Sequence, residues 1–486
     1  MSASLISGIL IAYFLLLIVV SYFTSKNAST DDFFTAKKSS PWYLVAFGMI
    51  GTSISGATFI SVPGKVSLSQ FSYYQVVIGQ FTGLLVVIYV LLPLYYRLNL
   101  ISIYTYLEKR FGKFSYKTGS MFFIVSRTLG ASIRLFLAAK VLQDFIFEQF
   151  NVPFYVTVLI TILLIWVYTI KGGIKTIIWT DSLQTLFLIT ALVVSIIFLS
   201  HELHLGTTGL VTEVYKSNYS KIFFFDDIKA KNYFFKNFIS GLFLAIAMIG
   251  LDQDLMQKNL TCKDYSEARK NMLVFSFIML FVNLLFLSLG ALLYMYIDVN
   301  HISLNITDTD DMYPNMALKY LGSVTAICFL LGITASSYAS SDSALASLTT
   351  AFCIDFLNFS SKSEEVKKTQ KLWVHIGFSI LFFIVILVYR AYSNKAVIDA
   401  LFTIAGYTYG PLLGMFSFGI LTKRNTQDKL IPIFSLISPA VTYGIFYYVE
   451  KYKDLYKFSF ELLVINAFIM FVLMFVVSKK THKKAF

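Results

Sequence analysis

Hydroxyl side chains recur with helical spacing beside one aspartate in a stretch that is otherwise apolar enough to cross a lipid bilayer. The stretch reads TASSYASSDSALAS over residues 334–347, and Ser336, Ser340, Ser343 and Ser347 step by four, three and four. These steps place the four hydroxyls on one face of a helix. Polar groups at membrane depth are costly to bury, so we expect a path or a site for a small cation. Close packing of small residues between helices is the alternative explanation.

The composition indicates a helical protein with many membrane spans. The chain of 486 residues is 57% hydrophobic and 14% charged, with a mean hydropathy of +0.70, whereas soluble domains carry about 25% charged residues. The net charge of +13 does not indicate nucleic-acid binding, because the basic residues fall in short loops between apolar stretches. The chain has no Walker motif, His/Glu metal constellation or recognisable nucleophile–base pair, which argues against an ATP-driven pump and against an enzyme.

Thirteen apolar stretches have roughly the length of a membrane span. We therefore predict an all-α polytopic membrane protein with about 13 transmembrane helices. The stretches lie near residues 5–23, 42–64, 71–96, 119–146, 153–170, 177–200, 233–257, 272–297, 319–355, 372–390, 396–421, 430–449 and 458–478.

Lys and Arg are unevenly divided between the two sets of loops. One set holds 25 of the 40 basic residues, so we predict that this set is cytoplasmic, with the N-terminus outside and the C-terminus inside. The opposite loops include 201–232 and 298–318, and we expect the acids of the second to solvate it. The basic set comprises segments 24–41, 97–118, 171–176, 258–271, 356–371, 422–429 and 479–486.

Two of the predicted spans are rich in helix-breaking residues. The second reads WYLVAFGMIGTSISGATFISVPGKV, and the seventh is loosened around Gly241 and Gly250. Interrupted helices in corresponding positions of two halves point to a transporter built from inverted repeats. Unwound carbonyls near Gly51 to Ile54, together with the serine face, would offer oxygen ligands for Na⁺.

Three further charged residues fall within apolar stretches. Asp181 begins the sixth span, either as an acid favoured by the helix dipole or as a functional group. Asp342 would serve a second cation or pair with a buried Arg. Arg134 lies near the middle of the fourth span, where an unpaired guanidinium is costly. It would pair with Asp342 or another acid, or bind the carboxylate of a substrate.

With these residues in view, the chain resembles the sodium:solute symporter family over about residues 1–425. Five segments carry the resemblance in the order expected for the family. They are FGMIGTSISGATFISVPGKV, VVIGQFTGLLVVIYVLLPLYYRLNLISIYTYLEKRFG, GGIKTIIWTDSLQ, GLDQDLMQKNLT and GYTYGPLLGMFSFGIL.

The resemblance implies a LeuT-type inverted-repeat fold that works by alternating access. Residues 1–41 would form an extra N-terminal helix with a cytoplasmic loop, and 42–200 the first five-helix repeat. An extracellular loop at 201–232 would precede the second five-helix repeat at 233–421. Residues 422–486 would supply two C-terminal helices and a basic cytoplasmic tail.

The resemblance also implies site residues. The main sodium site would use the carbonyls of Gly51, Ile54 and Ser336 with the hydroxyl of Ser340, although Ala339 stands where the family usually has a second hydroxyl. A second site would use Asp181, Ser343 and Asp342. The substrate-binding candidates, among which Gln80 is an isolated polar residue in an apolar stretch, are Ser55, Thr58, Gln80, Arg134 and Tyr407.

We therefore interpret the chain as a secondary active symporter in which Na⁺, as coupling ion, drives import of a small polar organic solute. The solute would be a sugar, sugar acid, amino acid or carboxylate. Alternatives are a proton-coupled transporter of the same fold and a non-transporting nutrient receptor. We expect a multi-pass protein of the bacterial inner membrane, with a monomer as the working assumption and no nucleic-acid partner.

Overall fold

The computed structural model is a bundle of long helices. Within the ranges it describes, nine helices are long and apolar enough to cross a membrane, and two further pairs would each form one span across a bend. Two shorter apolar helices, α10 and α21, complete the bundle, and each of the thirteen predicted stretches overlaps one of these helices or pairs. The described residues are 3–26, 36–169, 173–304, 306, 308–357, 359–392, 397–451 and 456–480.

The elements before residue 203 form the first half of the bundle. The apolar span Val66–Arg97 runs from α5 to α7, with η2 and η3 between them, and α9 continues through η4 and η5. The elements are α1 (Ala3–Ser25), η1 (Ala36–Lys38), α3 (Trp42–Ser53), α4 (Gly56–Gly64), α5 (Val66–Ser69), η2 (Gln70–Ser72), α6 (Tyr73–Val86), η3 (Val87–Leu91), α7 (Leu92–Arg97), α8 (Thr105–Arg110), α9 (Lys113–Leu142), η4 (Gln143–Phe147), η5 (Glu148–Phe150), α10 (Phe154–Thr169) and α11 (Gly173–Glu202).

The elements after residue 203 form the second half. A two-residue antiparallel ribbon pairs Arg424 with Lys480 and ties the end of α19 to the end of α21. The elements are α12 (Thr207–Lys216), α13 (Phe234–Ala245), η6 (Ile246–Gly250), α14 (Gln253–Asn259), α15 (Tyr265–Val299), η7 (Thr309–Asp311), α16 (Met312–Lys319), α17 (Gly322–Leu357), η8 (Phe359–Ser361), α18 (Glu364–Tyr392), α19 (Val397–Leu421), β1 (Arg424–Asn425), η9 (Asp428–Leu430), α20 (Ile431–Lys451), α21 (Leu462–Val476) and β2 (Lys479–Lys480).

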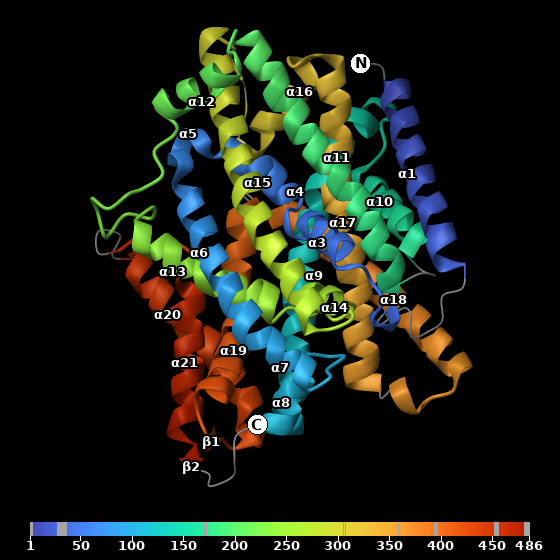
Figure 1. Ribbon diagram of the computed structural model, residues 1–486, viewed down its shortest axis with the longest axis vertical. Coiled ribbons are helices and arrows are strands. Elements are labelled where there is room, and N and C mark those ends of the chain that lie inside the picture. Colours follow the sequence, from blue (N-terminus) through green and yellow to red (C-terminus); the bar gives the residue numbers. More distant parts are fainter. Residues whose placement is uncertain are drawn as a thin grey trace.

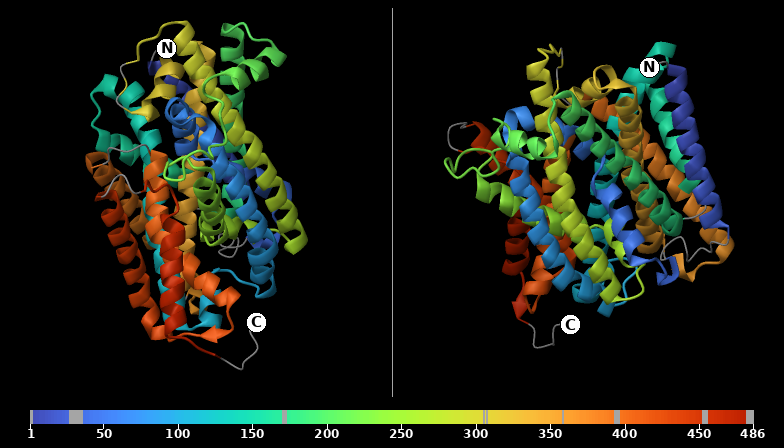
Figure 2. Two further views of the ribbon diagram at one scale, coloured as in Figure 1. Left: turned by 90° about the vertical axis from the view of Figure 1, so that its left-hand side faces the viewer. Right: turned by 45° about the horizontal axis from the view of Figure 1, so that its top comes forward.

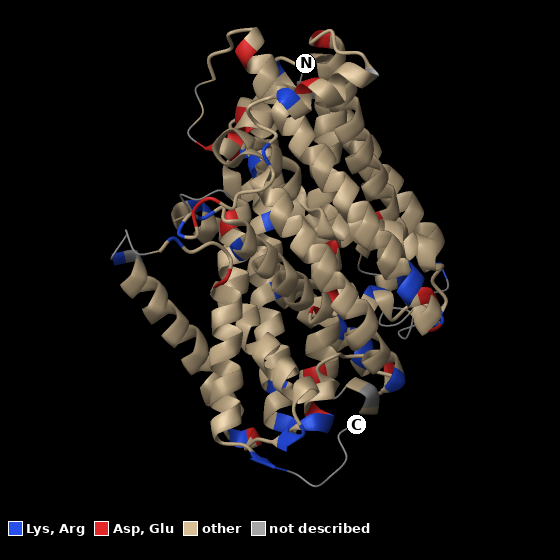
Figure 3. Ribbon diagram, turned by 60° about the vertical axis from the view of Figure 1, so that its left-hand side comes forward, with Lys and Arg blue, Asp and Glu red and all other residues tan. Residues whose placement is uncertain are grey.

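Helix α17 lies at the centre of the bundle. It packs against α3, α9, α11 and α18, and every residue from Gly332 to Ala351 is buried. Figure 1 shows α11 and α17 passing through the middle, and Figure 2 shows α1 and the α20–α21 pair at opposite edges. Lys and Arg gather near the end that carries the C-terminus (Figure 3).

Both spans predicted to be interrupted are broken. Helices α3 and α4 meet at 55°, and α13–η6 meets α14 at 67°. At the first break Ile54 (φ −85°, ψ 82°) and Ser55 (φ −78°, ψ 173°) leave helical geometry, in a segment of glycines and hydroxyl residues with poor helix propensity. At the second, Asp252 caps the new helix by accepting from the amide of Asp254. The prediction of two interrupted helices is confirmed.

A proline inside α19 creates a contact with α21. Pro411 has no amide hydrogen to donate to Tyr407, the residue four positions earlier. The side-chain amide of Asn466 on α21 donates to the freed carbonyl of Tyr407 and to that of Gly406, at 3.0 Å in each case. The two helices are therefore joined at the point where α19 is weakest.

The acids of the 298–318 loop do more than solvate it. Asp311 pairs with Lys140 of α9. Asp310 is buried, and its Oδ2 accepts a hydrogen bond of 2.8 Å from the amide of Val397, the first residue of α19. Burial raises the pKa of Asp310 from an ordinary value near 3.8 to about 6. The folded protein therefore holds this proton more tightly than the unfolded chain does.

This difference predicts that Asp310→Asn stabilises the protein at neutral pH. Ionising Asp310 in the fold lowers stability as the pH rises from about 4 to about 6, and the penalty is fully present above pH 6, whereas Asn keeps the acceptor for Val397 without a charge. Thermal unfolding in detergent should show a higher Tm for the variant at pH 7.5 and no difference near pH 4. A variant less stable than the wild type at pH 7.5 would contradict this account.

Candidate functional site

The end of α3 lies between α11 and α17. The Gly51 amide donates to Thr185 Oγ1 at 3.0 Å, and the Thr52 hydroxyl donates to Asp181 Oδ2 at 3.0 Å. A helix leaves its last four carbonyl groups without an amide donor of its own. In α3 these carbonyls run from Gly51 to Ile54, and they include both carbonyls predicted to coordinate sodium.

The other side of the break touches the serine-rich part of α17. Gly56 packs so closely on Ser337 that a Cβ at position 56 would overlap the Ser337 hydroxyl. Ser340 follows Ser337 by about one turn of α17, whereas the adjacent Ser336 points about 100° away from Ser337. The Ser340 hydroxyl has one long contact, 3.5 Å to the Ser337 carbonyl. The structure therefore brings the interrupted span against the serine-rich part of α17 at Ser337.

Sequence reasoning missed Ser337 as a member of this region. Its hydroxyl is buried and has no hydrogen-bond partner within the described part of the chain, and the same holds for the Ser53 hydroxyl at the end of α3. An unsatisfied buried hydroxyl is costly unless something else completes its coordination. The signal in the sequence was Gly56, since a side chain at this position would displace the Ser337 hydroxyl and the end of the Ile333 side chain.

The second break is satisfied by protein groups. The carbonyl of Gly250 accepts from the Tyr95 hydroxyl at 2.8 Å, and that of Leu251 accepts from the Tyr104 hydroxyl at 3.0 Å. The cap residue Asp252 in turn accepts from Tyr409. The polar contacts described at the first break involve the Gly51 amide and the Thr52 hydroxyl instead.

The proposed second sodium site has a protein cation beside it. Lys258 Nζ lies 2.5 Å from Asp181 Oδ2 and also donates to the Thr52 hydroxyl. Its side chain is 1% exposed, although the sequence places Lys258 at the start of a basic loop. The other oxygen, Asp181 Oδ1, has no hydrogen-bond partner among the described residues, so a sodium ion at this carboxylate would share it with the ammonium group.

The other two residues predicted for the second sodium site also have protein partners. Ser343 donates to Asp254 Oδ1. Asp342 accepts from the Tyr168 hydroxyl at 2.8 Å and from the Ser343 amide at 2.5 Å. We therefore restrict the proposed sodium site to the first set of ligands.

The two arginines of α9 have different surroundings, although their spacing of seven residues places them on one face. Arg127 pairs with Asp254, and its other terminal nitrogen lies 3.8 Å from Asp252. Arg134 is also buried, yet it forms no ion pair with any described residue, and its Nε has no hydrogen-bond partner there. Pairing with Asp342, one of the two predicted roles of Arg134, is not observed.

Arg134 lines a small cavity of about 70 Å³, which we call the arginine cavity. Four of the five predicted substrate residues meet there, namely Ser55, Thr58, Gln80 and Arg134. The fifth, Tyr407, does not line the cavity, because it lies on a different face of α19 and its ring is 6.3 Å from that of Tyr443 on α20. Aromatic and aliphatic side chains complete the wall, including Tyr73, Ile398, Leu401 and Phe402.

Comparison with known protein families now assigns the chain. A family model described as the sodium:solute symporter family matches residues 33–429. The chain belongs to the sodium:solute symporter family. Its activity is therefore the sodium-driven import of a solute by alternating access, and it is not an enzyme.

Curated relatives of this symporter include both bacterial and animal transporters. The sodium/sialic acid symporter NanT of Aliivibrio fischeri is 26% identical over 86% of this chain and 83% of its own length. The sodium-coupled monocarboxylate transporter 1 of Mus musculus is 26% identical over 81% of this chain and 64% of its own length. The human sodium/iodide cotransporter is 23% identical over 83% of this chain and 63% of its own length.

Solved structures confirm the fold of the symporter. The outward-open, substrate-bound state of a Na⁺-coupled sialic acid symporter superposes with a TM-score of 0.84, at 21% identity over 98% of this chain and 99% of that one. The nucleobase-cation symporter Mhp1 in a closed conformation gives a TM-score of 0.54 at 15% identity, over 92% and 93%. The predicted LeuT-type architecture is thus shown.

The contact between Gly56 and Ser337 predicts the effect of adding one methyl group. Gly56→Ala should weaken apparent sodium affinity at least about fivefold, because overpacking costs roughly 1–3 kcal/mol and the strain falls where the two halves of the site meet. The measurement is the sodium concentration that half-maximally raises the Tm of the purified protein.

Gly377→Ala is the matched control for this substitution. A Cβ at position 377, on α18, would meet no atom within 4 Å, so sodium affinity should equal that of the wild type. Equal sodium affinities for the two variants would show that the contact between Gly56 and Ser337 does not affect sodium binding.

Proposed function

We propose that this symporter imports an anionic solute whose carboxylate is bound by Arg134. The observation that carries the proposal is a buried guanidinium without an acidic partner among the described residues, facing a cavity that also holds Gln80, Ser55 and Thr58. An isolated buried charge is costly, and a carboxylate matches the planar donor pattern of Arg.

The neighbouring charges support this reading. Asp252 and Asp254 are engaged by Arg127, and Asp181 is engaged by Lys258. Arg134 is thus the basic group of this region that contacts no carboxylate directly among the described residues, so its guanidinium donors are open to the carboxylate of a bound solute. The relatives named for sialic acid and for monocarboxylates carry solutes of this class.

The proposed sodium ligands are the carbonyls of Gly51, Ile54 and Ser336 with the hydroxyl of Ser340. Sodium bound there would hold the interrupted span formed by α3 and α4 against α17. Because Ser55 and Thr58 follow directly in the chain and line the arginine cavity, the ion would also fix two groups of the substrate site. This arrangement gives a physical route by which sodium favours solute binding.

We further propose the location and division of the chain inferred from its sequence. Two repeats at 42–200 and 233–421, each opening with a broken span, would lie in a bacterial inner membrane with the basic loops in the cytoplasm. The uneven Lys and Arg distribution and the bacterial relatives support this placement.

Replacing Arg134 tests the substrate assignment. Arg134→Ala should lower the affinity for a carboxylate solute at least about tenfold, since a hydrogen bond to a charged group contributes about 1.5–3 kcal/mol. Purified protein in nanodiscs is screened by thermal shift with N-acetylneuraminate, lactate, galactose and proline, each with and without Na⁺. We expect stabilisation of the wild type by an acid only when Na⁺ is present.

The sodium response serves as the internal control in this screen. Na⁺ alone should stabilise Arg134→Ala as much as the wild type, because Arg134 is not among the proposed sodium ligands. Full retention of acid binding by the variant would exclude Arg134 as the residue that binds the carboxylate.

Replacing Ser340 tests the sodium assignment. Ser340→Ala removes one oxygen ligand, and by the same magnitude for a charged contact we expect at least about tenfold weaker sodium activation of uptake in proteoliposomes. Ser347→Ala is the control, because Ser347 lies on the same face of α17 but its hydroxyl donates to the Ala344 carbonyl at 3.0 Å. If both variants respond to Na⁺ like the wild type, the ligand is misplaced.

A further inference from the structure

A second and larger cavity lies next to the arginine cavity. Its volume is about 440 Å³, within the range of roughly 300–1,000 Å³ typical of small-molecule sites, whereas the arginine cavity has only about 70 Å³. We call it the lysine cavity. Its walls come from α4 to α6, from the loop before α13, from α19 and from the segment before α21.

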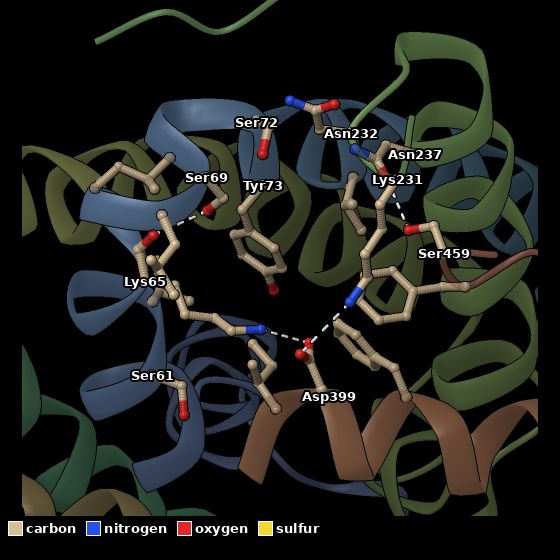
Figure 4. A pocket seen from close by; sticks show the side chains of 17 residues that line it. Ser61, Lys65, Ser69, Ser72, Tyr73, Lys231, Asn232, Asn237, Asp399 and Ser459 are labelled. Atoms are coloured by element: carbon tan, nitrogen blue, oxygen red, sulfur yellow. Dashed lines mark hydrogen bonds and ion pairs between the residues drawn. The ribbon is translucent and has the colours of Figure 1, made fainter. Parts of the chain in front are cut away.

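The charged groups of the lysine cavity do not balance. Lys65 Nζ lies 2.5 Å from Asp399 Oδ1, and Lys231 Nζ lies 3.7 Å from Asp399 Oδ2. Figure 4 shows both lysine side chains reaching toward this one carboxylate from different walls. These three are the charged residues among the described lining, so two ammonium groups share one carboxylate and the cavity carries a net charge of +1.

Lys231 is the cation that is less tightly held. Its side chain is 56% exposed, against 24% for Lys65 and 22% for Asp399, and the longer distance to Asp399 gives the weaker ion pair. An incoming carboxylate could therefore bind Lys231 without breaking the contact between Lys65 and Asp399.

The polar lining is suited to a hydroxylated solute. Hydroxyl and amide groups ring the space around the lysines, and the Tyr73 ring projects into it (Figure 4). Carboxylate recognition by ammonium groups beside neutral hydrogen-bonding groups is a general arrangement for polar anions. These neutral polar side chains are Ser61, Ser69, Ser72, Tyr73, Asn232, Asn237 and Ser459.

Three side chains line both cavities and separate them. They are Tyr73 of α6 and Ile398 and Phe402 of α19. The rings of Tyr73 and Phe402 are stacked, with centroids 6.5 Å apart and an angle of 15° between their planes. A solute in the lysine cavity would thus be one aromatic pair away from Arg134.

We propose that the lysine cavity is a binding site for the transported anion, which it holds through Lys231 and Lys65 before passage between Tyr73 and Phe402 to Arg134. This inference rests on the proposed function, since it takes the solute to be a carboxylate. The cavity opens beside the loop that we place outside the cell, so it would collect the solute from that side. Its positive charge would also raise the local concentration of anions.

The test compares two lysines of the same loop. Lys231→Gln removes a cavity charge, whereas Lys221→Gln removes the same charge from a side chain that pairs with Asp226 at 3.3 Å and does not line the cavity. Neither residue belongs to the proposed arginine or sodium sites. Initial uptake of N-acetylneuraminate, lactate and galactose is measured in proteoliposomes at saturating Na⁺.

We expect Lys231→Gln to raise the KM for the transported acid about three- to tenfold, the effect of one charge contact in water, with little change in kcat. The KM of Lys221→Gln should match the wild type. Added choline chloride should raise the KM of the wild type toward that of Lys231→Gln, because salt screens the interaction. A purely structural role for Lys231 would not produce this salt dependence.

Direct binding provides the second measurement. The Arg134→Ala protein in nanodiscs should still bind N-acetylneuraminate weakly in equilibrium dialysis, and adding Lys231→Gln should abolish that binding. A KM for Lys231→Gln equal to that of Lys221→Gln overturns the lysine-cavity site while Arg134-dependent uptake leaves the proposed function standing. Absence of any acid uptake by the wild type overturns both.

Discussion

The fold depends on how backbone carbonyls are satisfied where two spans are interrupted. Inside a bilayer no water is available to donate hydrogen bonds to these carbonyls, so each break needs a partner from elsewhere in the molecule. At Gly250 and Leu251 the partners are the hydroxyls of two tyrosines. At the end of α3 the proposed partner is a sodium ion shared with α17. The same kind of break thus anchors one half of the bundle and, in our proposal, would bind the coupling ion in the other.

Charge pairing in the interior follows a similar division of roles. Arg127 and Lys258 each neutralise acids carried by or facing the second interrupted span and its neighbours. These pairs hold α14 against α9 and α11. Arg134 has no acidic partner among the described residues, and Lys231 shares Asp399 with Lys65. These two cations line adjoining cavities. In our proposal these two cations would mark the route of the anion between the ion-paired helices.

The sequence predicted the elements well and their partners poorly. Span positions and both breaks followed from apolar length and from clusters of glycine, which act locally. Arg127 and Arg134 share a helix face, so only the position of Asp254, more than a hundred residues away, distinguishes them. The sequence placed Lys258 in a loop because charged residues usually lie outside membrane spans. In the structure Lys258 is buried and paired with Asp181. Tyr407 does not line the cavity, because its side chain lies on the face of α19 that meets Tyr443 of α20, and the sequence alone does not show which face of a buried helix meets which neighbour.

The proline in α19 has a mechanical consequence. Asn466 donates to the carbonyls near Pro411, and the short ribbon joins the far ends of the two helices. We therefore expect α19 and α21 to move together, and Phe402 of α19 to move with them. A tilt of α19 that separates Phe402 from Tyr73 would also displace α21 in the surrounding lipid. The stiffness and thickness of the bilayer would then affect the rate at which the passage between the two cavities opens.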